Sequence, residues 1–288
     1  LKNNTPDEDN NQGGVVERRF GLGVMPLIEF KEPINPYYRV AFFSKSKQHK
    51  LTFAGDTVCN VKSHIIRREP APLCSVESYV LESSFNRIFV EVDSANNVII
   101  PKFNKMGNAT QFSFAVDFGT TNTHIEYSID GSTTSHAFDI TKNEQQMQRM
   151  HQNYGADRDI QYAFADAFIP DTIAAEDDYS FPMRTAFAEW INIDYKRQTD
   201  SLADGNIPFR YEKAAIPPYN KIKTDIKWNN KESDRVRLYL DNLFFLIRNK
   251  VLMNGGNLAA TKIVWFYPVS MTKARCDAFA TIWANLYT

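Results

Sequence analysis

The sequence has few cysteines, almost no net charge and no long apolar run. Only three of its 288 residues are cysteine, namely Cys59, Cys74 and Cys276. An odd number of widely spaced cysteines does not make a disulfide framework, so we expect a reducing, cytoplasmic compartment. The 33 Lys and Arg residues are balanced by 34 Asp and Glu residues, which leaves a formal charge of -1. Without a basic surplus, the chain is not predicted to bind nucleic acid.

Membrane insertion is not predicted either. The longest apolar windows, at 243–247 and 263–266, are much shorter than the roughly 20 residues of a transmembrane helix. With 43% hydrophobic residues the chain can bury a core, and its length corresponds to about two domains. It begins at Leu1 without an initiator Met or a signal-peptide pattern, so we expect a piece of a longer parent protein.

The first 106 residues divide into a polar tail and a β-rich module. Residues 1–18 are almost free of apolar side chains and are predicted to be a tail or linker. Within 19–106, short runs of β-branched and aromatic residues alternate with turn residues, and no helical period is present. The predicted strands lie at 24–30, 37–43, 75–81, 87–92 and 98–100. This pattern predicts a sandwich-like or barrel-like accessory module, for which we expect a protein partner.

Residues 107–288 are predicted to form a layered α/β domain. Three strands in series, separated by tight turns, should pair antiparallel. They are expected at 112–117, 124–129 and 135–140. Two amphipathic helices, at 231–253 and 273–286, flank a strand at 262–268 that we expect to be buried. Residues 142–230 are predicted to be an inserted subdomain, with a short helix near 143–153 and a strand near 181–188.

The predicted chemistry lies in the segment from Asp117 to Thr123. A carboxylate follows a buried strand, and Gly119, Thr120 and Thr121 then supply a turn rich in backbone N–H groups and hydroxyls. A nest of amides binds an anion, and one carboxylate suits Mg²⁺, which keeps most of its water ligands. From the residues alone, the segment is either part of a Mg²⁺-nucleotide site or a threonine-rich hairpin turn whose hydroxyls satisfy the backbone.

One stretch resembles the first phosphate-binding motif of the superfamily of actin, DnaK-type chaperones and sugar kinases: Ala115-Val116-Asp117-Phe118-Gly119-Thr120-Thr121-Asn122-Thr123. With Asn122 after the two threonines, the motif resembles that of the DnaK-type branch more than that of the sugar kinases. The resemblance implies the first lobe of an actin-like ATPase, with a ribonuclease-H-like mixed sheet and flanking helices. It implies ATP and Mg²⁺ as cofactors, with Asp117 as a catalytic residue that holds the Mg²⁺ waters. The residues implied to bind the nucleotide are Asp117, Gly119, Thr120, Thr121, Asn122 and Thr123.

Chaperones of this superfamily also bring a lysine to the phosphates. The strand at 181–187 resembles their Pro-Ser strand, although Met183 replaces the Ser. Lys223 follows it at a comparable distance, so the resemblance implies Lys223 as the second catalytic residue. Lys196 has more similar neighbours in sequence but comes too early. The alternative interpretation of either lysine is an ordinary surface residue whose charge is solvated.

Two features of the superfamily are missing from the sequence. The second lobe's Asp-Gly-Gly-Gly-Thr-type turn and its Gly-Gly adenosine loop have no counterpart, because Asp130-Gly131 is a hairpin turn and Gly255-Gly256 ends a helix. Half a nucleotide cleft should bind weakly and turn over poorly. We therefore expect an ATP-binding chain that is inactive alone and belongs to a larger hydrolase. The alternatives are a small-molecule kinase of the same fold and a non-catalytic interaction module.

Chaperone activity does not follow from the resemblance, because DnaK-type chaperones carry their β-rich domain after the ATPase, and here the β-rich module comes first. Other chemistry is weakly supported. Cys59, His64 and Cys74 lack the paired spacing of zinc ligands. His124 is expected to be a packed strand residue. The acidic loop at 176–178 is expected to be solvated.

Overall fold

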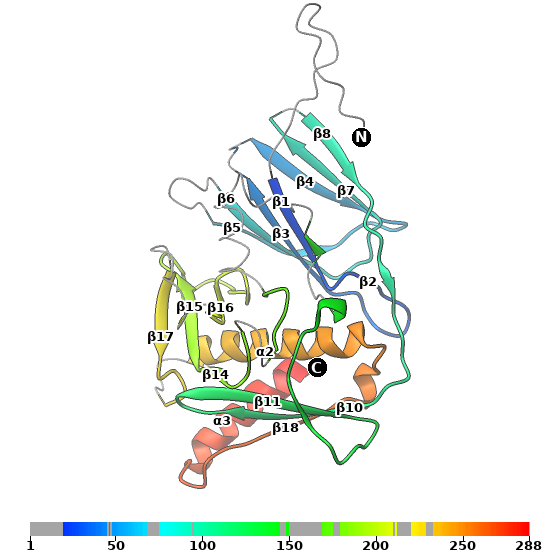
Figure 1. Ribbon diagram of the computed structural model, residues 1–288. Coiled ribbons are helices and arrows are strands. Elements are labelled where there is room, and N and C mark those ends of the chain that lie inside the picture. Colours follow the sequence, from blue (N-terminus) through cyan, green and yellow to red (C-terminus); the bar gives the residue numbers. More distant parts are fainter. Residues whose placement is uncertain are drawn as a thin grey trace, which may run out of the picture.

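The computed structural model describes residues 20–44, 46, 48–67, 75–93, 95–144, 148–149, 169–174, 179–209, 211, 220–228 and 233–287. Over these residues the protein is mixed α/β and consists mostly of sheets, which confirms the predicted class. Figure 1 shows helix α2 (Ser233–Met253) between the N-terminal strands and a second group of strands, with α3 (Lys273–Tyr287) beside it. Across the described ranges, no helix is long and apolar enough to cross a membrane. The predicted tail at 1–18 lies outside them.

Two antiparallel sheets, formed mostly by the first hundred residues, share a core. Across the first sheet the strands are β13 (Gln148–Arg149), β1 (Phe20–Met25), β3 (Tyr38–Ser44), β6 (Ser75–Leu81) and β5 (Val61–Arg67). Across the second they are β4 (His49–Ala54), β7 (Arg87–Val92) and β8 (Ala95–Ile99). Phe42 of the first sheet and Val90 of the second belong to the same buried cluster. A short parallel pair, β2 (Ile28–Glu29) with β9 (Asn104–Lys105), completes this part.

The strongest strand patterns in this part predict the observed strands. The predicted strands at 75–81 and 87–92 coincide with β6 and β7, and 37–43 lies within one residue of β3. The run at 24–30 is divided between β1 and β2. β4 and β5 were not predicted, because lysines and histidines interrupt their apolar residues on the exposed face.

Strand β3, in the middle of the first sheet, is buried on both faces. Every residue of β3 is buried, and its side chains alternate between two clusters. Tyr38 and Phe42 pack in the core shared with the second sheet, whereas Ala41 and Phe43 pack in a larger core with residues from the rest of the chain. Hydrophobic contacts therefore cross the predicted domain boundary at 106, which stays a prediction.

The second group of strands forms a mixed sheet. Its order is β12 (His136–Ala137), β11 (Asn122–Ile129), β10 (Phe112–Phe118) and β18 (Lys262–Trp265), and β14 (Met183–Arg184) pairs with the start of β11. β10, β11 and β12 pair antiparallel, as predicted, although β12 is only two residues long. β18 runs parallel to β10.

The prediction that the strand at 262–268 is buried is wrong. β18 covers only 262–265, and among the described strands it pairs with β10 alone. Val264 is 57% exposed and Phe266 is 54% exposed. An apolar run of this length fits a buried strand and a half-exposed edge strand equally well, so sequence pattern alone did not separate them.

Both predicted C-terminal helices are confirmed. Tyr239 of α2 packs on Phe118 of the mixed sheet, with ring centroids 5.3 Å apart, and Phe245 meets Tyr37 of the N-terminal part at 6.4 Å. Helix α2 thus contacts both groups of strands. Helix α3 buries Phe279 and Trp283.

The segment between the mixed-sheet strands is the part predicted least well. The helix predicted near 143–153 is wrong where the structure describes it. A single 3₁₀ turn, η1 (Lys142–Glu144), is followed by strand β13, which joins the N-terminal sheet; the remaining residues of this stretch lie outside the described ranges. The strand predicted near 181–188 corresponds to β14 and β15 (Ala186–Trp190). β15 forms a small sheet with β16 (Gly205–Asn206) and β17 (Asn220–Thr224).

Candidate functional site: the turn between β10 and β11

The predicted phosphate turn connects two paired strands of the mixed sheet. β10 places Val116 and Phe118 in the core, so Asp117 between them faces the opposite side and is exposed. Asp117 pairs with His124 across the hairpin, and the chain reverses through residues 119–121. Thr121 and Asn122 are also exposed, whereas Gly119 and Thr120 are half-buried. The turn therefore presents a carboxylate, hydroxyls and a carboxamide together.

A network of hydroxyl groups supports the turn from beneath. Thr185 Oγ1 donates to the Gly119 carbonyl at 2.8 Å, and the Thr185 N–H donates to the Thr121 carbonyl at 2.8 Å. Thr123 Oγ1 lies 2.8 Å from Thr185 Oγ1 and accepts from the Tyr239 hydroxyl at 2.8 Å. Thr123 is fully buried. The structure thus places Thr123 among the buried residues that support the turn, away from its exposed side.

Gly119 is required by the close packing of the turn. A Cβ atom at this position would lie 2.3 Å from the carbonyl oxygen of Asn122, well inside contact distance. The constraint is steric, since Gly119 is not among the glycines with positive φ.

Replacing Gly119 with alanine is expected to destabilise the protein by about 1 to 3 kcal/mol, because the backbone must shift to admit the methyl group. Urea unfolding would measure the loss, with Thr133→Ala in the next, exposed turn as the control. A G119A variant as stable as T133A would show that the turn has room for a side chain.

Two cations lie next to the turn, and neither was predicted. Lys227 is buried, and its Nζ donates to the Phe118 carbonyl and lies 5.4 Å from the Phe118 ring centroid. Burial lowers the pKa of Lys227, while the charge of Asp117 acts in the opposite direction. Arg275 of α3 donates to the Lys227 carbonyl. The ammonium group of Lys227 therefore interacts electrostatically with the carboxylate of Asp117, and Arg275 lies beside Lys227.

Trp228 links this cationic segment to the turn. Its indole N–H donates to Thr120 Oγ1, and the Arg275 guanidinium lies 5.3 Å from its ring centroid. Because the Thr120 oxygen is the acceptor, the hydroxyl hydrogen of Thr120 remains available to a ligand.

The predicted lysines lie elsewhere. Lys223 is on β17, where its Nζ is 3.9 Å from Glu189 Oε1. Lys196 is exposed, and its backbone N–H bonds to Asp194 Oδ1 at 2.9 Å. Lys227 comes four residues after Lys223, beyond a bend at Asp225, where φ is 58°. That bend brings Lys227 rather than Lys223 to the turn, and the sequence carries no clear signal for it.

The other residues considered in the sequence do not form sites in the described structure. Cys59 has a free thiol, His64 Nε2 bonds to Glu77 Oε2 at 2.8 Å, and Cys74 lies outside the described residues. His124 bonds to Glu126 on the same strand at 3.1 Å. The acidic loop at 176–178 also lies outside the described ranges. Within the ranges, no three His, Cys, Asp or Glu side chains group as metal ligands.

Comparisons with models of protein families, with curated proteins and with solved structures found no match to this chain.

Proposed function

We propose that the turn at 117–123 binds the phosphates of Mg²⁺-ATP, and that residues 107–288 form the first lobe of an ATPase of the actin and DnaK-type superfamily. The proposal rests on the resemblance of the motif and on its setting in the fold. Three antiparallel strands and a parallel fourth make a mixed sheet, with α2 preceding β18 and α3 following it. That is the kind of sheet, with flanking helices, that the resemblance implies.

The observation that carries the proposal is the exposed carboxylate of Asp117 at the end of β10, next to the buried ammonium of Lys227. Mg²⁺ keeps several waters and usually takes one or two carboxylates, so a lone exposed Asp fits this ion better than an ion that needs a full protein cage. Asp117 would hold the ion through its waters. Mg²⁺ bound there would neutralise phosphate charge.

The phosphates would be held by the turn and by Lys227. Thr120 and Thr121 have hydroxyls on or near the exposed side, and the backbone N–H groups of the turn add further donors. Lys227 uses one of its three hydrogens on the Phe118 carbonyl, which leaves two for an anion. Lys227 thus takes the role that the resemblance implied for Lys223. Hydrolysis would require the second lobe that this superfamily uses, so the activity proposed for this chain is binding.

Replacing Asp117 with asparagine is expected to weaken Mg²⁺-ATP binding about tenfold or more, because an interaction with a charged group contributes about 1.5 to 3 kcal/mol. Calorimetric titration with ATP, in Mg²⁺ and in EDTA, would measure it. The loss should be confined to the Mg²⁺ titration. Glu91→Gln, an exposed acid on β7, is the matched control.

The same titration separates the two lysines. Lys227→Met should weaken ATP binding with or without Mg²⁺, whereas Lys223→Met should leave it near the wild-type value. Far-ultraviolet circular dichroism would show that both variants fold. Equal affinities of the wild type and D117N would contradict the proposal, as would a wild-type chain that does not bind ATP; the turn would then be only scaffold.

A further inference from the structure

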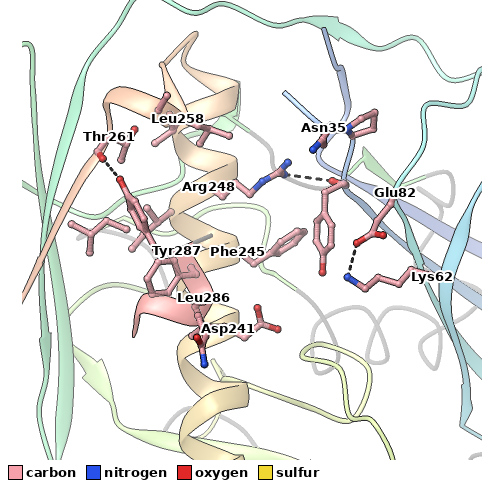
Figure 2. A pocket seen from close by; sticks show the side chains of 18 of the residues that line it. Asn35, Lys62, Glu82, Asp241, Phe245, Arg248, Leu258, Thr261, Leu286 and Tyr287 are labelled. Atoms are coloured by element: carbon pink, nitrogen blue, oxygen red, sulfur yellow. Dashed lines mark hydrogen bonds and ion pairs between the residues drawn. The ribbon is translucent and has the colours of Figure 1, made fainter. Parts of the chain in front are cut away.

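A large cavity lies between α2, α3 and the N-terminal strands, away from the phosphate turn. Its volume is 860 Å³, which is within the range of ligand pockets, about 300 to 1,000 Å³. Figure 2 shows Phe245 and Arg248 of α2 facing the N-terminal segment near Asn35, with Leu258 and Leu286 on the other side. No residue of the turn at 117–123 lines this cavity.

The wall of the cavity combines apolar and polar surface, and most of its charged side chains are paired. Phe244, Phe245, Leu258, Ile263 and Leu286 supply apolar surface. At the rim, Lys62 forms an ion pair with Glu82. Asp241 is paired with Arg39 at 3.2 Å and also accepts from the Ser201 hydroxyl.

Arg248 is the exception among the charged lining residues. Its Nη1 donates to the Tyr37 carbonyl over a long 3.4 Å, and the guanidinium lies 5.1 Å from the Phe30 ring centroid and 5.4 Å from that of Tyr37. Burial lowers the pKa of Arg248 to about 10, and the charged or ionisable groups acting on it are two tyrosines and Arg39. In the described part of the chain, no carboxylate forms an ion pair with it.

A largely buried guanidinium without a carboxylate is energetically unfavourable until an anion reaches it. Its five N–H donors, arranged as a planar fork, match a carboxylate or sulfonate. Two donors are the most that a single backbone carbonyl can engage, so part of the fork remains unused. The aromatic and aliphatic walls would cover the rest of a ligand, and Asn35, Asn60 and Asn285 add carboxamides at the edges.

We propose that this cavity binds an organic anion, in which one carboxylate or sulfonate pairs with Arg248 and an apolar body lies against Phe244, Phe245 and Leu286. This site is separate from the proposed nucleotide site and does not depend on it. A nucleotide is a poor fit here, because a triphosphate carries several charges and, among the described residues that line the cavity, Arg248 is the one cation without a carboxylate partner.

The test uses two dyes with nearly the same apolar body. 1-Anilinonaphthalene-8-sulfonate carries an anionic group, and N-phenyl-1-naphthylamine does not. In fluorescence titrations of the whole chain, Arg248→Met should weaken binding of the sulfonate about tenfold or more, as expected for loss of a charge-assisted contact, and leave the neutral dye unchanged. Ala259 is an exposed residue of the cavity wall, and Ala259→Phe, which places a large side chain there, should weaken binding of both dyes.

Competition identifies the preferred chemistry. Decanoate should displace the sulfonate dye from the wild type at lower concentration than decanol does, and inorganic phosphate should not displace it. Arg248→Lys, which keeps the positive charge but not the planar set of donors, should bind the sulfonate dye with intermediate affinity. This variant is the control for a folding defect in R248M. Asp117→Asn should bind the sulfonate as the wild type does. The proposal is overturned if R248M weakens both dyes equally, if it weakens neither, or if A259F has no effect.

Discussion

Replacing Lys250 with methionine is expected to lower the free energy of unfolding by about 3 to 5 kcal/mol, because the change leaves two carboxylates without their cation. Lys250 lies near the end of α2, and its side chain is only 2% exposed. Its Nζ is 2.8 Å from Asp139 Oδ1 and 2.7 Å from Glu144 Oε1. Asp139 also accepts from the Tyr127 hydroxyl at 2.9 Å, so the cluster joins α2 to the mixed sheet.

Urea unfolding of a set of variants would measure this. Lys273→Met, at an exposed lysine that begins α3, is the control and should change stability by less than about 0.5 kcal/mol. Adding Glu144→Gln to K250M should recover part of the loss, because one of the two unpaired charges is removed. Equal stability of K250M and K273M would contradict the prediction. It would mean that water screens the ion pairs of Lys250 with Asp139 and Glu144, although the Lys250 side chain is buried.

The second large effect is expected at Glu77, which is buried in the N-terminal sheet. His49 Nε2 and the Tyr79 hydroxyl bond to its carboxylate, and His64 Nε2 does so at 2.8 Å. Burial alone would raise the pKa of Glu77, but these hydrogen bonds outweigh it and lower the pKa to about 2. Relative to an unfolded value of 4.5, this shift corresponds to about 3 kcal/mol of stability.

The pH dependence follows from the direction of that shift. A lowered folded-state pKa gives a contribution that is complete above about pH 4.5 and is lost as the pH falls towards 2. The hydrogen bond to Glu77 raises the pKa of His49, so that contribution is present below about pH 6.5 and is lost as the pH rises through the raised value.

Glu77→Gln should therefore cost about 3 kcal/mol near pH 5 to 6 and less at either extreme. Thermal or urea unfolding at a series of pH values would give the profile, and Glu91→Gln on the neighbouring sheet should follow the wild type. A constant difference between E77Q and the wild type from pH 2 to 8 would mean that the effect comes from packing and not from the charge.

The sequence predicted those elements whose pattern is both long and regular. Helix α2 and strands β6 and β7 have unambiguous periods, and they lie where predicted. Burial was harder to predict than element type. Val236 and Leu243 lie on the apolar face of α2 and are buried, as its amphipathic pattern predicts. Nothing in that pattern predicts that Lys250 on the same helix is also buried, because its partners Asp139 and Glu144 lie more than 100 residues earlier.

The candidate site divides in the same way. The residues from Asp117 to Asn122 are contiguous, so their common turn could be predicted from the motif alone. Lys227 and Thr185 reach the turn from 109 and 66 residues away. Their positions depend on how β14, β15 and β17 pack. Spacing along the chain selected Lys223, which lies just before the bend at Asp225, whereas the lysine at the turn is Lys227, just after that bend.

The burial of strand β3 on both faces has a consequence for the order in which the chain can assemble. Strands β1, β3, β5 and β6 are synthesised before the elements that cover the face carrying Ala41 and Phe43, and Arg39 contacts Asp241 across 202 residues of sequence. Contacts of such separation form slowly, and apolar sheet surface that waits for its cover promotes aggregation. While the nascent chain is incomplete, we therefore expect this uncovered face to be a site of chaperone binding.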